Sequence, residues 1–407
     1  MNRFDRFFEE TRRTPEEERA RRTPGEVRGL PEGEWVDQGV YRLSHTYAIG
    51  APHGAHPLEN PDDMAEMRHF GAKERVVFLD LETTGLAGGT GTYAFLCGIG
   101  FADRGVFRVL QFFLGGPAHE AAWLRAVGES IPDDACLATY NGKTFDIPLL
   151  RTRHVLARSA PAWDRLPHLD LLHYARRLYR GHLESCSLSS MERNVLAVAR
   201  SGEDIPGAMI PPLYMQFLRT RDATPLRGVF YHNVLDIVSL AALYCHISHV
   251  LAGERGDGRE LTRGGDIWQA RGEYARAGRL WDIACEREVS GAEAFARKGF
   301  AAKKRGDHIA AADAFSSALS LLTQDPRKYR GDFLSYKTLE ELAKLQEHRL
   351  RSPQAALGHT EAALEWLRAN RYFLGRQYGV LHRAMRQRQA RLERKAGKGG
   401  GNDDVEP

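Results

Sequence analysis

The sequence has few cysteines, and none of them is spaced for a cross-link or a zinc site. Its five cysteines, at positions 97, 136, 186, 245 and 285, are scattered, and no Cys-x-x-Cys pair occurs. An odd number of widely separated cysteines argues against both a disulfide framework and a zinc ribbon. We expect them to be small apolar side chains of a protein in a reducing cytoplasm.

Long apolar runs are also missing, and we expect no leader segment. No stretch approaches the roughly 18 consecutive apolar residues of a membrane-spanning helix, so we expect no membrane partner. The first residues, MNRFDRFFEETRR, carry charges where a signal peptide would have its apolar segment. These absences favour a cytoplasmic protein.

The chain as a whole has only a small excess of positive charge, but positive residues are concentrated near the C-terminus. The net charge of +4 is too small to indicate a polyanionic partner by itself. Between Arg371 and Lys398, however, there are nine Lys or Arg and a single acid, Glu393. This pattern is typical of a surface that contacts phosphates or a partner, and equally of a solvated helix face.

The length of 407 residues predicts about two or three domains. Composition suggests a partly disordered N-terminal extension over 1–70, an α/β domain over 71–252, and a Gly-, Arg- and Asp-rich linker over 253–265. An all-helical domain over 266–390 and a flexible tail over 391–407 follow.

The α/β assignment depends on a change of periodicity along residues 75–251. Short apolar runs predict strands, and apolar residues at helical spacing predict helices between them. Strands are expected at 75–80, 93–99, 105–113 and 136–140; helices at 120–129, 147–156 and 234–251; and an extended segment that becomes helical at 168–179. Three strands followed by alternating helices and strands predict a mixed sheet.

The C-terminal half contains an internal repeat. Gly272–Trp281 aligns with Gly306–Phe315 at an offset of 34 residues, the period of tetratricopeptide helix pairs. A third, degenerate copy is expected around Ser352–Leu367. Trp281 and Phe315 occupy equivalent positions and, with Trp366, are expected in the core of the stacked helices.

Two acids end the strand that begins at Arg75. Asp80 and Glu82 lie two residues apart, so the alternation of a strand places both carboxylates on one face. Neighbouring carboxylates ionise together only at a cost, which a hard divalent cation removes. Two acids at the end of a strand with no further role are the alternative.

Two further acids and a histidine stand at element ends. Asp146 lies between an Asn-Gly turn and a helix, where it predicts either a helix cap or a carboxylate at the sheet edge that Asp80 occupies. Asp236 is a charge at the start of a strongly apolar helix. His232, four residues earlier, shares its helical face and is placed to take a proton from water or to contact solvent.

These motifs resemble those of DnaQ-like nucleases with a ribonuclease H fold. Val77–Gly85, reading VFLDLETTG, resembles their first exonuclease motif, Asn141–Asp146 their second and His232–Asp236 their third. The chain is similar to the bacterial YprB-type family, also called MrfB, over roughly 70–250 and more loosely over 262–370. Further matching stretches are Leu86–Thr92, His168–His173 and Asp204–Gly207.

The resemblance implies an α/β ribonuclease H-like domain of DEDD type followed by tetratricopeptide-like repeats. It also implies a 3′–5′ exonuclease that hydrolyses DNA phosphodiester bonds in DNA repair, with a helicase as partner. Two Mg²⁺ or Mn²⁺ ions would be held by the four acids, with Asp80 bridging them. His232 would assist the attacking water; Tyr231, five residues before Asp236, is the alternative, although phenols are poor bases at neutral pH.

Substrate contacts are expected from two polar segments beside the acids. The candidates are Thr83, Thr84, Gly85, Asn141 and Lys143. The Gly- and Thr-rich segment from Thr83 to Thr92 fits a backbone that approaches a terminal nucleotide, or a purely structural turn. His168, Asp170 and His173 resemble a metal-ligand cluster, but we expect Asp170 to be a capping or supporting group and the histidines to be structural.

Two other functions share these residues. A 3′–5′ exoribonuclease would use every one of the same acids, so the motifs do not separate DNA from RNA. A non-catalytic adaptor that binds nucleic acid through its helical repeats is the second, and the presence of all four acids argues against it.

Overall fold

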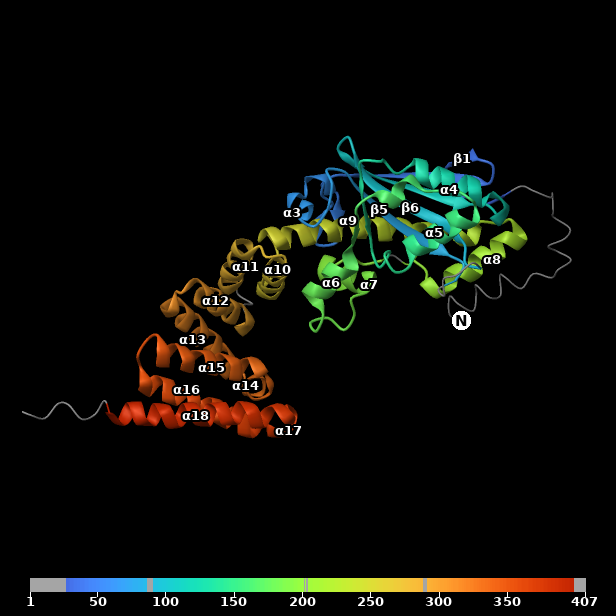
Figure 1. The fold of residues 1–407 in the computed structure, drawn as a ribbon. Coiled ribbons are helices and arrows are strands. Elements are labelled where there is room, and N and C mark those ends of the chain that lie inside the picture. Colours follow the sequence, from blue (N-terminus) through green and yellow to red (C-terminus); the bar gives the residue numbers. More distant parts are fainter. Residues whose placement is uncertain (1–26, 86–90, 201, 203, 288–290, 399–407) are drawn as a thin grey trace, which may run out of the picture. The chain divides into compact units, whose positions relative to one another are not determined.

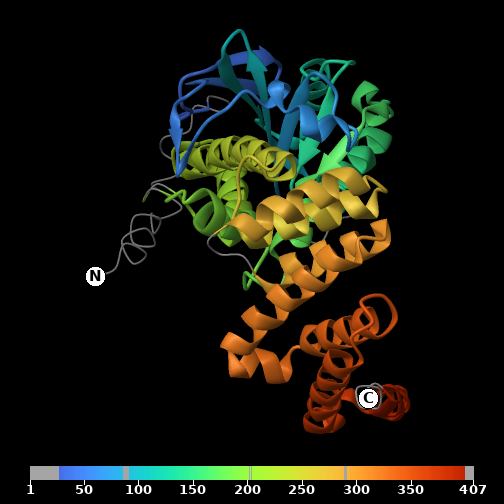
Figure 2. The same ribbon diagram turned by 90° about the vertical axis from the view of Figure 1, so that its left-hand side faces the viewer.

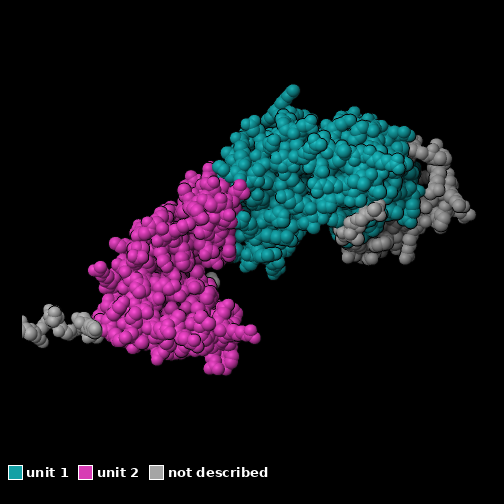
Figure 3. Space-filling model, in the orientation of Figure 1, with its two compact units in different colours: residues 1–248 teal, residues 249–407 magenta. Residues whose placement is uncertain are grey.

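The computed structural model describes residues 27–85, 91–200, 202, 204–287 and 291–398. The chain divides into two compact units, Met1–Ser248 and His249–Pro407, which we call unit 1 and unit 2 (Figure 3). The division falls inside one helix, close to the boundary expected at 252.

Unit 1 is built on a seven-stranded mixed sheet (Figure 1). In the order β1-β2-β7-β6-β5-β8-β9, each pair of neighbours from β1 to β5 is antiparallel, whereas β8 runs parallel to β5 and β9 runs parallel to β8. The strands are β1 Glu34–Asp37, β2 Val40–Ala48, β5 Val76–Thr83, β6 Ala94–Asp103, β7 Val106–Leu114, β8 Cys136–Thr139 and β9 His168–Asp170. A separate hairpin pairs β3 Pro52–His53 with β4 His56–Pro57.

Two of these strands lie in the segment that composition assigned to an extension. All nine residues of β2 pair with β7, so the sheet begins well before the expected boundary at 71. The first half of β2 is buried at Val40 and Leu43, but its second half is partly exposed and polar, which removes the apolar alternation. The expectation of an extension over 27–70 was therefore wrong; residues 1–26 lie outside the described residues.

Alternation along β5 separates the two faces of the sheet. Val77, Leu79 and Leu81 belong to the main core of unit 1. On the other face, the rings of Phe78 and Tyr244 meet edge to face with centroids 5.5 Å apart. The helices expected from periodicity are present as α4 Glu120–Glu129, α5 Asp146–Leu156, α6 Leu171–Tyr179 and α9 Arg227–Ala252. Three helices that were not expected are α3 Ala65–Arg68, α7 Leu188–Met191 and α8 Ile210–Thr220.

Helix α9 is the longest element of the chain that the structure describes (Figure 2). By length and composition alone, the segment Thr224–Ala252 could cross a membrane. However, 83% of its most apolar window is buried in the protein. It is therefore a core helix that lies along the sheet. Polar residues within such an apolar helix are unusual, and they are described with the candidate site below.

Unit 2 is entirely helical over its described residues. Its helices are α10 Gly258–Ala270, α11 Tyr274–Glu286, α12 Ala292–Arg305, α13 His308–Gln324, α14 Pro326–Gly331, α15 Phe333–His348, α16 Pro353–Ala369, α17 Arg371–Leu374 and α18 Arg376–Lys398. Helices α10 and α12 begin 34 residues apart, and so do α11 and α13.

The repeat extends to a matched pair of side chains. A Cβ at Gly265 would lie 2.3 Å from the Trp281 ring, and one at Gly299 would lie 2.9 Å from the Phe315 ring. Both pairs are related by the same offset, so each large ring packs where a glycine leaves space. The third hairpin departs from this spacing, and membership of the tetratricopeptide family stays a prediction.

Two expected irregular segments are largely helical. In the expected linker 253–265, Asp257 and Glu260 form a capping box that starts α10, and the glycines within the helix pack against α11. In the expected tail, α18 continues to Lys398 because Arg391 and Lys395 pair with buried Glu347. Residues 399–407 lie outside the described residues.

Candidate metal centre

Asp80 and Glu82 project from β5 on the face that Phe78 shares. Glu82 is buried, and Asp80 is partly buried. Burial raises the pKa of Asp80 well above its usual range, and the charges of Asp236 and Asp146 raise it further. Burial likewise raises the pKa of Glu82, with Asp80 as the next cause. The two carboxylates therefore lie in an environment that disfavours their joint ionisation.

Asp146 is the first residue of α5 and points back to the same strand. Its carboxyl lies near the backbone of Leu81, between Asp80 and Glu82, which partly offsets the effect of burial on its pKa. Burial raises its pKa to about 7. The N-cap of α5 is Phe145, so the alternative of Asp146 as a capping side chain is wrong.

Asp236 reaches the cluster from α9. Burial raises the pKa of its carboxyl, and the nearby charges of His232 and Arg200 oppose that change. One carboxylate oxygen accepts a hydrogen bond from the Arg200 guanidinium. Since Asp236 also raises the pKa of Asp80 and Glu82, four acids from β5, α5 and α9 interact in one place.

His232 lies one helical turn before Asp236, as its spacing predicted. Its Nε2 is 3.6 Å from Asp236 Oδ2, and its Nδ1 is 2.7 Å from Asp204 Oδ1. A carboxylate on Nδ1 fixes the ring and leaves Nε2 directed to the cluster. The phenol of Tyr231 instead interacts with Tyr47 of β2, contributing to the raised pKa of that residue.

Among the described residues, Arg200 is the arginine that forms an ion pair with one of the four acids. Its Nε lies 2.7 Å from Glu192, a buried acid at the start of the π-helical segment η4 Glu192–Leu196. Its Nη1 lies 3.4 Å from Asp204 and 3.1 Å from His232 Nδ1. One guanidinium thus joins Glu192, Asp204 and Asp236, and π-helical turns are frequent at functional sites.

Asp80 is held by a buried amide network. Asn233 Nδ2 donates to Asp80 Oδ2 at 2.9 Å, and Gln111 Nε2 donates to Asn233 Oδ1 at 2.9 Å. Both amides are fully buried, and His45 Nε2 lies 3.2 Å from Gln111 Oε1. Gly98 makes this possible, because a Cβ there would lie 2.4 Å from Asn233 Oδ1.

The donor chemistry fits hard divalent cations, which prefer carboxylate oxygens. Within the described part of the chain, no three His, Cys, Asp or Glu side chains form a ready-made metal cage. The carboxylate of Asp236 is paired with Arg200. Carboxylates that raise one another's pKa gain most from a cation, so the residues fit such an ion once Asp236 is released.

The expected substrate contacts fall into two groups. Thr83 Oγ1 donates to the Gly85 carbonyl, and Thr84 Oγ1 accepts from the Tyr93 N–H, so both hydroxyls already support the turn after β5. The side chains of Asn141 and Lys143 are exposed after β8. The remainder of the Gly- and Thr-rich segment, 86–90, lies outside the described residues.

Asp170 supports the loop that carries these two residues. It accepts hydrogen bonds from the backbone N–H groups of Asn141 and Lys143 at 2.8 and 3.0 Å and also caps α6. The expectation of a capping and supporting role is confirmed. His168 Nε2 lies 2.8 Å from Thr139 Oγ1, and burial lowers the pKa of this histidine to about 4, as a structural histidine would show.

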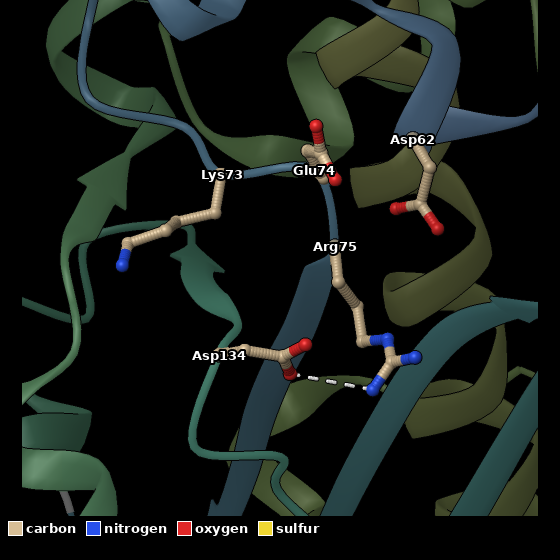
Figure 4. A pocket seen from close by; sticks show the side chains of 5 residues that line it. All are labelled: Asp62, Lys73, Glu74, Arg75 and Asp134. Atoms are coloured by element: carbon tan, nitrogen blue, oxygen red, sulfur yellow. Dashed lines mark hydrogen bonds and ion pairs between the residues drawn. The ribbon is translucent and has the colours of Figure 1, made fainter.

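A separate pocket of about 420 Å³ lies at the opposite edge of the sheet (Figure 4). Its lining includes Asp62, Lys73 and Glu74, together with the Arg75–Asp134 pair at 3.3 Å. These residues precede β5 and β8, whereas Asp80 and Glu82 lie in the C-terminal half of β5 and Asp146 follows β8. Ligands of α/β sheets collect at the carboxyl ends of strands, so we place the site at the acids and not here.

Sequence reasoning missed the residues that hold the acids. Gln111 is an amide within the apolar strand β7, and that contrast is a usable signal. Asn233 directly follows His232 in the third motif. Arg200 and Glu192 carry no local signal, because their roles come from contacts with residues far along the chain.

Comparisons with known proteins agree with this arrangement. A family model described as RNase_H superfamily matches residues 77–248. A Bacillus subtilis (strain 168) protein described as uncharacterized protein YprB is 39% identical over 188 residues, which is 45% of this chain and 44% of that protein. The chain thus matches less than half the length of this relative. Unit 1 contains an RNase H-like domain, and that superfamily points to a nuclease that binds nucleic acid and uses divalent metal ions.

Proposed function

We propose that the protein is a metal-dependent 3′–5′ exonuclease that hydrolyses phosphodiester bonds of DNA, in the setting of DNA repair. The observation that carries the proposal is the convergence of Asp80, Glu82, Asp146 and Asp236 from three elements. A structural role does not account for four acids gathered where burial and mutual repulsion penalise their charge.

Divalent ions bound by these carboxylates would activate water and stabilise the charge that develops on the phosphate. Asp80 is oriented for this by Asn233, and Asp146 lies at the start of α5 beside the backbone of β5. His232, oriented by Asp204, presents Nε2 toward Asp236 and is the candidate base for the attacking water.

The exposed side chains after β8 supply substrate contacts in this proposal. Lys143 provides a charge for a phosphate and Asn141 an amide, on a loop that Asp170 fixes through two backbone hydrogen bonds. Thr83, Thr84 and Gly85 provide the turn that faces the terminal nucleotide. Partners such as a helicase belong to the proposal only through the family resemblance.

The decisive experiment uses a 5′-labelled DNA duplex with a 3′ tail, incubated with Mg²⁺ or Mn²⁺. A ladder that shortens from the 3′ end, disappears in EDTA and stops at a 3′-terminal phosphorothioate would support an exonuclease of this polarity. Asp80→Asn should abolish the ladder. Asp134→Asn is the matched control, because this exposed acid lies at the opposite edge of the sheet.

Matched RNA completes the test. Cleavage of RNA with no cleavage of DNA would replace the DNA proposal by an exoribonuclease with the same acids. Wild-type protein that binds metal but cuts neither nucleic acid would contradict the proposed function.

A further inference from the structure

The last two helices of unit 2 form a surface that the proposed active site does not use. Helix α18 has one buried side, with Met385 and Leu392 at 1% and 0% exposure. Arg376, Arg383 and Arg394 are exposed. The helix is therefore strongly divided into an apolar side and a basic side.

The arginines of the exposed side are in register. At 100° per residue, Arg376, Arg383 and Arg394 lie within about 20° of one another around the helix axis. They span 18 residues, which corresponds to about 27 Å along the helix. No acidic side chain among the described residues pairs with any of the three, so a row of unneutralised positive charge faces solvent.

A different set of basic residues serves the fold. Arg388, Arg391 and Lys395 surround the carboxylate of Glu347, whose side chain is fully buried. These contacts attach α18 to α15. The contacts with Glu347 explain why Arg388, Arg391 and Lys395 are basic. They do not explain the exposed row of Arg376, Arg383 and Arg394.

Two large aromatic side chains stand at the start of the row. Tyr372 and Phe373 of α17 are 87% and 77% exposed, among the highest values for apolar side chains in the described chain. The Arg371 guanidinium lies 4.8 Å from the centre of the Tyr372 ring. Val380, on the first turns of α18, is also 71% exposed.

We propose that α17 and α18 bind single-stranded nucleic acid, with the arginine row on the phosphates and Tyr372 and Phe373 stacking on bases. Positive charge in a row complements a polyanion, and exposed rings beside it offer faces that any base can stack on. The proposal rests on the proposed function and assigns the binding of single-stranded nucleic acid to unit 2. A binding measurement tests it without any cleavage.

The test measures anisotropy of fluorescein-labelled oligodeoxythymidine with the full-length protein in EDTA, over a series of salt concentrations. Each phosphate contact on a single strand contributes about 0.7 to the slope of log affinity against log salt. Replacing Arg376, Arg383 and Arg394 by Gln should therefore reduce the slope by about 2. A control triple, Arg327, Arg349 and Arg368 to Gln, removes the same charge from exposed positions outside α17 and α18.

Tyr372→Leu with Phe373→Leu separates stacking from apolar contact. We expect a loss of affinity of about fivefold or more with an unchanged salt slope. Equal effects of the two arginine triples would overturn the proposal, and so would binding to anionic lipid vesicles with none to the oligonucleotide. If binding behaves as expected while no nucleic acid is cut with metal, the proposed function fails and this inference stands.

Discussion

Arg200 forms an ion pair with Asp236, one of the four acids that we propose to bind metal ions. Its guanidinium donates to Asp236 and pairs with buried Glu192 on its other side. An ion that uses Asp236 as a ligand must break the first of these contacts. We therefore predict that Arg200→Gln binds divalent metal more tightly than the wild type.

The magnitude follows from the contact that is lost. A hydrogen bond between charged groups contributes about 1.5–3 kcal/mol, and Arg200 is only 17% exposed, so solvent screens this one weakly. Removing the competition should tighten binding by roughly 10- to 100-fold, since each 1.4 kcal/mol is about a factor of ten. Isothermal titration with Mn²⁺ at pH 8 measures the change directly, and catalysis plays no part in it.

The unpaired charge of Glu192 is an alternative source of affinity in that variant. The double variant Arg200→Gln/Glu192→Gln removes it, and the gain should persist. Arg75→Gln, at the pocket on the opposite edge of the sheet, is the control for loss of one positive charge. Unchanged or weaker Mn²⁺ binding in both Arg200 variants would refute the idea that Arg200 competes with the metal.

Three further predictions concern the acids and unit 2. Asn233→Leu removes the donor to Asp80, so the pKa of Asp80 should rise further and the pH at which Mn²⁺ binding is half-maximal should move upward; an unchanged midpoint would contradict the network. The pKa of Asp146 is raised to about 7, so without metal the folded protein binds more protons than the unfolded chain between about pH 4 and 7, and its stability should fall as pH rises through this range. Mn²⁺ binding should tighten over the same range, because the ion needs the ionised carboxylate. Thermal unfolding in EDTA and in Mn²⁺ at several pH values checks both signs, and Asp146→Asn should flatten both. Arg391 and its neighbours lower the pKa of Glu347 to about 2, so this stability is present above about pH 4.5 and lost as pH falls through about 2; Glu347→Gln should cost about 3 kcal/mol in chemical denaturation at neutral pH.

Local patterns were sufficient to predict the elements that carry the acids. The run ending in Asp80 and Glu82 is β5, and alternation placed both side chains on the face away from Val77, Leu79 and Leu81. The four-residue spacing of His232 and Asp236 predicted their shared face on α9. Each of these inferences needs only the geometry of one strand or one helix.

Other features depend on contacts between distant residues, and no local pattern contains them. β2 joins the sheet by pairing with β7, although its own second half is polar. Helix α10 contains adjacent glycines that resemble a linker, and only the Trp281 ring packed against Gly265 shows why a side chain is excluded there. Arg200 enters the site from a segment that no motif marks.

The groups next to two of the acids are uncharged, so they do not cancel the negative charge of an ionised carboxylate. Asp80 receives its hydrogen bond from the amide of Asn233, and the carboxyl of Asp146 lies near the backbone of Leu81. Neutral donors fix each carboxylate while leaving its negative charge available to a cation. Asp236 differs, because its partner Arg200 is itself a cation that is also tied to Glu192. In the proposed metal centre, a cation that binds Asp236 would displace Arg200, which keeps Glu192 as a partner. We therefore expect Asp236 to be the acid at which metal entry is controlled.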